Sequence, residues 1–116
     1  MFKLFKNVKG DKMPVSVYLR MDSFTNQEFS IQSGDQVYLY TDGFADQFGG
    51  NKGKKLKLRH FKDLIVQNST LTMREQKKML MQFLDNWINQ PKTKYEQTDD
   101  VMVLGLKFNS SSITNF

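Results

Sequence analysis

Two short stretches of the chain are apolar at nearly every position, and they constrain its fold more than any other feature. Val37–Tyr40 is apolar throughout, and Val101–Phe108 is nearly so. Because successive side chains of a strand point to opposite faces, such runs predict strands that are buried on both faces. Val37–Tyr40 is therefore predicted to form the centre of a sheet.

The segments around these runs predict the other elements. Alternating or β-branched residues predict strands at 15–20 and 26–32. Amphipathic patterns predict a short helix at 61–66 and a longer one at 72–90, which opens with a capping-box threonine and glutamate. Because strands come first, helices follow and a strand returns, we expect an α+β fold with an antiparallel or mixed sheet and helices on one face.

The composition limits the classes of function. The 116 residues suffice for one small domain. The absence of cysteine excludes a disulfide scaffold, a zinc-thiolate site and a thiol nucleophile, and the single histidine, His60, excludes a multi-histidine site. Any bound metal must therefore be held by oxygen atoms. The sequence has no apolar run as long as a membrane span and no signal-peptide core, so we expect a cytoplasmic location without membrane insertion of this segment.

Carboxylates stand next to both apolar strands. Asp42 directly follows the first strand, with Asp46 four residues on, and Asp99 and Asp100 directly precede the second. If the two strands are antiparallel neighbours, these carboxylates converge at one edge of the sheet, where a magnesium or manganese ion would relieve their repulsion. The alternative is that both segments are ordinary turns or solvated loop ends, where Asp and Gly are common.

Two longer stretches that contain these carboxylates resemble a known family. Gly34–Gly50, with Thr-Asp-Gly at its centre, and Gln97–Leu106, with Thr-Asp-Asp, are similar to the C-terminal half of the metal-dependent, protein phosphatase 2C-like phosphatases. The bacterial branch typified by stage II sporulation protein E is the most similar, and 11–15 and 24–28 also resemble its members on large sensor proteins. We therefore expect residues 1–108 to be the C-terminal portion of such a domain, a partial α/β/β/α sandwich, with 109–116 as a flexible tail.

The resemblance also implies a role for each carboxylate. Asp42 and Asp99 match ligands of a pair of divalent cations, Mn²⁺ or Mg²⁺. Asp46 matches a weaker metal ligand, and Asp100 matches a neighbouring position that supports the ligands. The implied reaction is hydrolysis of a phosphoserine or phosphothreonine ester of a phosphorylated protein by a metal-activated water, as the output of a bacterial sensor protein.

One departure from the family affects these expectations. The family's first half carries a further metal-binding Asp followed by Gly-His-Gly, which this chain lacks, and His60 does not replace it. We expect either a C-terminal piece of a longer protein or a truncated relative, which binds metal weakly and turns over poorly on its own. The alternative is a non-catalytic interaction module that docks on another protein or pairs with itself, as a homodimer, through exposed sheet edges.

The chain carries a net charge of +5, with basic residues concentrated between 52 and 62. Three glycines in 49–53 and these basic residues predict a mobile basic loop. Such a run is usually a solvated surface, but it can also attract the phosphate of a protein substrate. The candidates for that role are Lys54, Lys55, Lys57 and Arg59. Nucleic acid is not an expected partner, because the run has one aromatic residue, Phe61, and no nucleic-acid-binding motif.

Overall fold

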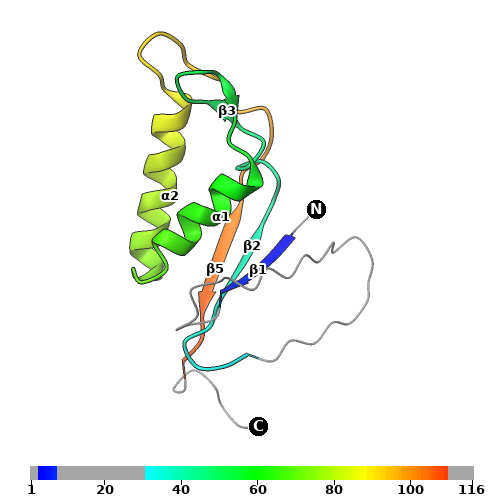
Figure 1. Ribbon diagram of the computed structural model, residues 1–116, viewed down its shortest axis with the longest axis vertical. Helices are drawn as coiled ribbons and strands as arrows, with labels where there is room; N and C mark the ends of the chain where they lie inside the picture. The colour runs from blue at the N-terminus through cyan, green and yellow to red at the C-terminus, as the bar shows by residue number, and fades with distance from the viewer. Residues whose placement is uncertain (1–2, 8–30, 110–116) are drawn as a thin grey trace. The chain divides into compact units, whose positions relative to one another are not determined.

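A computed structural model describes residues 3–7 and 31–109 of the chain (Figure 1). In chain order its elements are β1 (Lys3–Asn7), β2 (Gln36–Tyr40), β3 (Phe48–Gly49), β4 (Lys54–Lys55), α1 (Leu58–Gln67), α2 (Met73–Ile88) and β5 (Val103–Lys107). They divide between two compact units. The sheet unit comprises Met1–Tyr40 and Val103–Phe116, and the helical unit comprises Thr41–Met102.

Several predictions from the sequence lie outside the described residues. They are the strand at 15–20, nearly all of the strand at 26–32, the similar segments at 11–15 and 24–28, and all but one residue of the tail at 109–116. The helices and antiparallel sheets in the described part confirm the α+β class. None of the helices in the described ranges is long and apolar enough to cross a bilayer.

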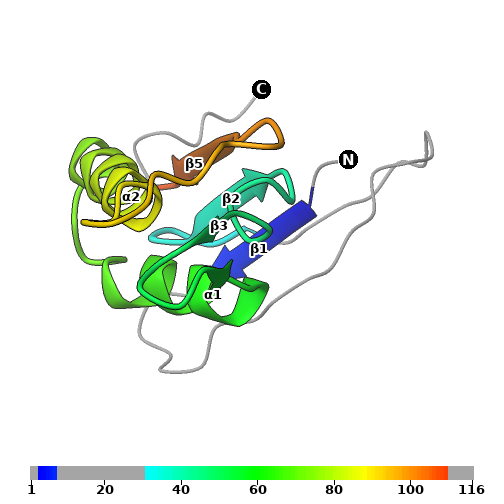
Figure 2. The same ribbon diagram turned by 90° about the horizontal axis from the view of Figure 1, so that it is seen from above.

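The sheet unit contains a three-stranded antiparallel sheet in the order β1-β2-β5 (Figure 2). The prediction that Val37–Tyr40 forms the centre of a sheet is therefore confirmed. β1 occupies a segment for which the sequence predicted no strand. A turn before β2 joins the end of β5, because Gly34 donates its N–H to the Phe108 carbonyl at 2.6 Å and Phe108 donates its own to the Asp35 carbonyl at 2.9 Å.

The prediction that both apolar strands are buried on both faces is wrong. Tyr38 of β2 is 1% exposed, whereas Leu104 and Leu106 of β5 are 49% and 41% exposed. Residues directly opposite each other in an antiparallel pair share a face, so Leu104 shares a face with Leu39, and Leu106 with Val37. An apolar residue at every position indicates a strand, but it does not determine which of the two faces is covered.

In the helical unit, the structure of the basic segment differs from the predicted loop. Instead of one loop from Lys52 to Lys62, β3 and β4 form a hairpin and α1 begins at Leu58. The hairpin turn contains Gly50 and Gly53 at φ 71° and 60°, a conformation that glycine adopts without steric cost. α1 begins three residues before the predicted 61–66 and so includes Leu58 and Arg59, which are both good helix formers.

The predicted long helix is confirmed as α2. Thr72 caps it by accepting the Glu75 N–H on Oγ1 at 3.2 Å, and the same hydroxyl donates to Glu75 Oε1 at 2.9 Å. The apolar stripe of α2 packs within the helical unit, where Phe83 stacks on Trp87 at a centroid distance of 5.9 Å. Phe44 and the buried Phe61 extend this aromatic core, with their ring centroids 4.9 Å apart.

Candidate functional site

Two loops of the helical unit carry the four candidate carboxylates. Hydrogen bonds of Thr41 hold these two loops side by side. Its N–H donates to the Met102 carbonyl at 3.0 Å. Its hydroxyl donates to the Asp100 carbonyl at 2.9 Å and accepts the Met102 N–H at 3.1 Å. The residue before the 42–46 loop is thus bonded to the end of the 97–100 loop, which brings the two Asp-containing motifs together.

Gly43 permits a close approach between the same two loops. A Cβ atom at this position would lie 2.8 Å from the Asp100 carbonyl carbon and closer still to its oxygen. Real Cβ atoms essentially never come that close to other heavy atoms, so a larger residue would force the loops apart. The glycine after Asp42 therefore does more than form a turn, because it allows the backbones of the two motifs to touch.

The 42–46 loop is a single helical turn. The Asp46 N–H donates to the Asp42 carbonyl at 2.9 Å. Residues four apart in such a turn are neighbours on one face, so Asp46 and Asp42 lie on the same side of the turn. Asp42 is half-buried and Asp46 is exposed.

The 97–100 loop is shaped by hydrogen bonds within itself. Asp99 accepts the Asp100 N–H on Oδ1 at 2.8 Å, and Gln97 donates its side-chain amide to the Asp99 carbonyl at 3.0 Å. Both aspartates are exposed. The carboxylates of this loop are therefore accessible to a cation from solvent.

Gln47 connects the segment that follows the 42–46 loop to the segment that precedes the 97–100 loop. This residue is 2% exposed, and its side-chain amide donates to the Phe48 carbonyl at 3.0 Å and the Glu96 carbonyl at 2.8 Å. Its own carbonyl accepts the Trp87 Nε1–H at 3.0 Å. The sequence analysis missed Gln47, because glutamine is mostly found on surfaces and no pattern marked this one as buried.

The carboxylates are the right kind of ligand for a divalent metal ion, but too few of the described ones lie close together to form a site. Oxygen ligands are those that Mg²⁺ and Mn²⁺ prefer, and four carboxylates lie on two adjoining loops. Within the described ranges, however, no three Asp, Glu or His side chains gather closely enough to hold an ion. The described residues of these two loops therefore do not by themselves form a complete metal centre.

The four basic candidates all lie on exposed positions near these loops in sequence. Lys54 and Lys55 form β4, Lys57 precedes α1, and Arg59 lies in its first turn. Lys57 is bonded directly to the acidic loop, since its N–H donates to the Ala45 carbonyl at 2.8 Å. His60, which is exposed, instead lies beside the rings of Phe83 and Trp87, at centroid distances of 5.5 Å and 6.2 Å.

Comparison with known proteins adds a family and a fold. The family model of Stage II sporulation protein E (SpoIIE) matches residues 7–109. Among solved structures, the chain is similar to the SiaA-PP2C domain of Pseudomonas aeruginosa, with a TM-score of 0.68 and 25% sequence identity over 93% of this chain. The match covers 43% of the SiaA chain, so this chain spans less than half of that structure. No curated protein matches it.

Proposed function

The chain belongs to the Stage II sporulation protein E family, and on this premise we propose that it forms part of a bacterial serine/threonine protein phosphatase. The resemblance to the 2C-like phosphatases is confirmed by the match to the SiaA-PP2C domain. The reaction we propose is hydrolysis of phosphoserine and phosphothreonine esters on a protein, in a signalling pathway. The observation that carries this proposal is the contact between the 42–46 and 97–100 loops, which brings two Asp-containing motifs to one place.

Each carboxylate has a proposed role in this site. Asp42 and Asp99 are the metal ligands, Asp46 is a weaker ligand beside Asp42 on the same helical turn, and Asp100 supports the site through its backbone contacts with Thr41. A pair of bound Mn²⁺ or Mg²⁺ ions supplies the activation of water and the neutralisation of phosphoryl charge in this class of reaction. The residues of this chain contribute by fixing the loops that hold the carboxylates.

We further propose that residues 1–108 are the C-terminal portion of the phosphatase domain. Two observations support this: the chain covers 43% of the similar SiaA chain, and in its described part no three candidate ligands cluster. Each missing carboxylate removes charge that would hold an ion against its hydration. We therefore expect the chain alone to hydrolyse p-nitrophenyl phosphate negligibly, even at millimolar manganese.

Calorimetric titration of manganese into the chain tests the ligand assignment. Asp42→Asn and Asp99→Asn should each weaken the affinity by about tenfold, because affinity at such sites depends on the number of charged ligands. Asp63→Asn, which removes an exposed carboxylate from α1, is the matched control and should leave the affinity unchanged. Unchanged affinity in both loop variants would refute the assignment. Manganese-dependent hydrolysis by the chain alone, abolished in Asp42→Asn, would show that the site is complete.

A non-catalytic interaction module is the second candidate. The observation that favours it is the exposure of Leu104 and Leu106 on β5, which is an edge strand in the described sheet. Exposed apolar side chains on an unpaired edge favour association with another chain or with a second copy. This candidate predicts self-association together with manganese affinity that does not depend on Asp42 or Asp99.

A further inference from the structure

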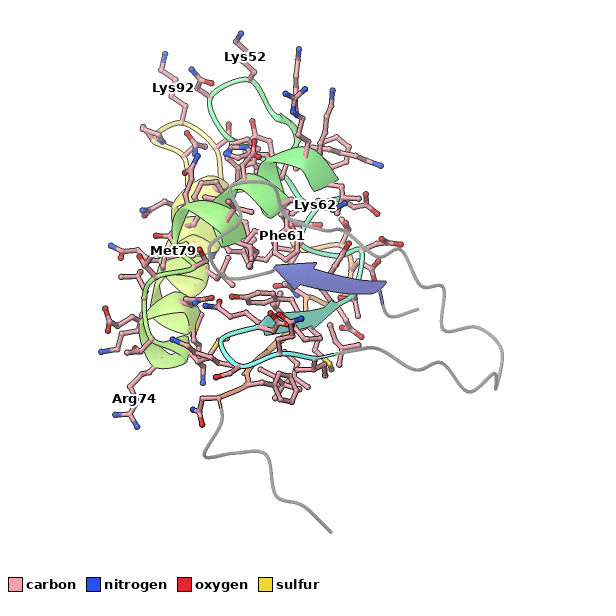
Figure 3. The ribbon with its side chains drawn as sticks, turned by 60° about the horizontal axis from the view of Figure 1, so that its bottom comes forward. Lys52, Phe61, Lys62, Arg74, Met79 and Lys92 are labelled. Atoms are coloured by element: carbon pink, nitrogen blue, oxygen red, sulfur yellow. The ribbon has the colours of Figure 1, made fainter. Side chains whose placement is uncertain are left out.

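Five exposed lysines gather at one end of the helical unit, which we call the cationic end. Three come from the β3–β4 hairpin and two from the loop that follows α2: Lys52, Lys54, Lys55, Lys92 and Lys94. Figure 3 shows Lys52 and Lys92 extending from the same end of this unit, whereas Arg74 lies at the opposite end of α2. The cationic end therefore combines segments that are about forty residues apart in the sequence.

Backbone packing holds the two segments together. Gly50 donates its N–H to the Trp87 carbonyl at 2.9 Å, and a Cβ atom at Gly49 would lie 2.6 Å from Trp87 Nε1. Near the hairpin tip, a Cβ atom at Gly53 would lie 2.7 Å from the Tyr95 hydroxyl oxygen. The hairpin thus lies directly against the end of α2 and the loop after it. The lysines are presented on a fixed support, which lowers the entropy cost of binding a ligand.

The cationic end concentrates positive charge. Residues 50–55 and 90–95 contain these five lysines and no aspartate or glutamate. Like charges that lie close together repel, and an anionic partner relieves that repulsion. Phe48 adds an apolar contact surface beside the charge, since it is 44% exposed and the Lys55 Nζ atom lies 5.7 Å from its ring centroid.

The cationic end is built on the same two segments as the candidate site. The hairpin follows the 42–46 loop, and the loop after α2 leads into the 97–100 loop. Gln47 and Glu96, which are bonded to each other, lie between the lysines and the aspartates on each segment. Lys52 is six positions from Asp46 in the sequence, which limits how far apart the two residues can lie. An extended peptide of about six residues is therefore long enough to reach from one to the other.

We propose that the cationic end docks an acidic segment of the phosphoprotein substrate, located within about six residues of the phosphorylated side chain. This inference rests on the proposed phosphatase function and adds a substrate class to it. The lysines bind the acidic side chains of the substrate, while its phosphoryl group reaches the 42–46 and 97–100 loops.

A polypeptide fits this surface better than a nucleic acid does. Acidic residues lie between the lysines and the candidate site on each segment: Asp46 precedes the hairpin lysines, and Glu96, Asp99 and Asp100 follow Lys92 and Lys94. A nucleic acid carries a charge on every phosphate, so a strand that extends from the lysines toward the loops would meet these carboxylates. A peptide with a short acidic cluster places its negative charge on the lysines alone.

Binding of a fluorescein-labelled hexaglutamate peptide, measured by anisotropy at low salt without added metal, tests the proposal. The test variant changes Lys52, Lys54 and Lys92 to Ser and leaves Lys55 beside Phe48. The matched control changes Arg74, Lys77 and Lys78, which are exposed on α2, to Ser, so both variants lower the net charge from +5 to +2. We expect the first variant to weaken binding by about tenfold and the second by less than about twofold.

The outcomes separate this proposal from its alternatives. Equal weakening in both variants, or in neither, would overturn it, because net charge or another surface would then account for binding. Tighter binding of a twelve-nucleotide oligothymidylate, lost in the first variant, would overturn it in favour of nucleic acid. The peptide assay contains no metal, so its result does not depend on the manganese site. A manganese affinity that is unchanged in Asp42→Asn and Asp99→Asn would therefore refute the phosphatase function and leave the peptide result as it is.

Discussion

Replacing Gly43 by alanine should separate the two acidic loops, and the structure indicates the size of the effect. The added methyl group would lie well inside contact distance of the Asp100 carbonyl, so the loops must move apart by more than an ångström. Such a shift lengthens all the hydrogen bonds of Thr41 with Asp100 and Met102, now 2.9–3.1 Å, beyond the range of effective bonding. With about 0.5–1 kcal/mol for each of the three bonds lost and about 1 kcal/mol for residual overpacking, we expect a destabilisation of about 2.5–4 kcal/mol.

Thermal unfolding followed by the fluorescence of Trp87 measures this effect, because the indole lies in the same unit and contacts Gly49 and Phe83. A loss of about 2.5–4 kcal/mol lowers the Tm of a domain of this size by about 10–20 °C. Thr41→Val removes the two hydroxyl bonds without a clash, so its effect should be smaller, about 1–2 kcal/mol. Asn51→Ala, at an exposed hairpin position, is the control and should change the Tm by less than about 2 °C.

If Gly43→Ala unfolds at the same temperature as the parent chain, the close approach of the two loops is wrong. The proposed site would then lose its main support, since the contact of these loops is what unites Asp42 with Asp99 and Asp100. If Thr41→Val lowers the Tm as much as Gly43→Ala does, hydrogen bonding rather than steric contact holds the loops together.

The elements that the sequence predicted well are those whose signals are local. In α2, the capping threonine Thr72 and the stripe that includes Phe83 and Trp87 belong to one continuous segment, and the helix forms where that pattern occurs. The antiparallel pairing of β2 with β5 entered the sequence analysis only as a condition, and the structure shows that the condition is met. Each strand is marked by its own apolar run, but no local signal in the sequence shows that the two runs are neighbours.

The features that the sequence did not predict depend on contacts between distant residues. The β3–β4 hairpin forms in a lysine-rich segment with weak strand propensity, because Gly49 and Gly50 pack directly against Trp87. The burial of Gln47 depends on Trp87 and Glu96, which lie at least forty residues away. Neither contact leaves a periodic pattern, so single-sequence reasoning assigned the whole segment to a loop.

Two further predictions concern the backbone and the exposed sheet face. Lys57 has φ 76° and ψ 151°, a strained conformation that glycine tolerates. Lys57→Gly should therefore raise the Tm by several degrees, whereas Lys57→Ala, which keeps the Cβ atom, should not. Equal Tm values for these two variants would contradict this prediction. If the exposed β5 leucines drive self-association, light scattering should detect a concentration-dependent dimer. Leu104→Thr with Leu106→Thr should weaken that dimer by at least about tenfold, because threonine keeps the strand propensity and removes apolar area. Met81→Thr, at a 62% exposed position of α2, should leave the dimer intact. A monomer at every concentration, or equal weakening by Met81→Thr, would show that this face does not mediate association.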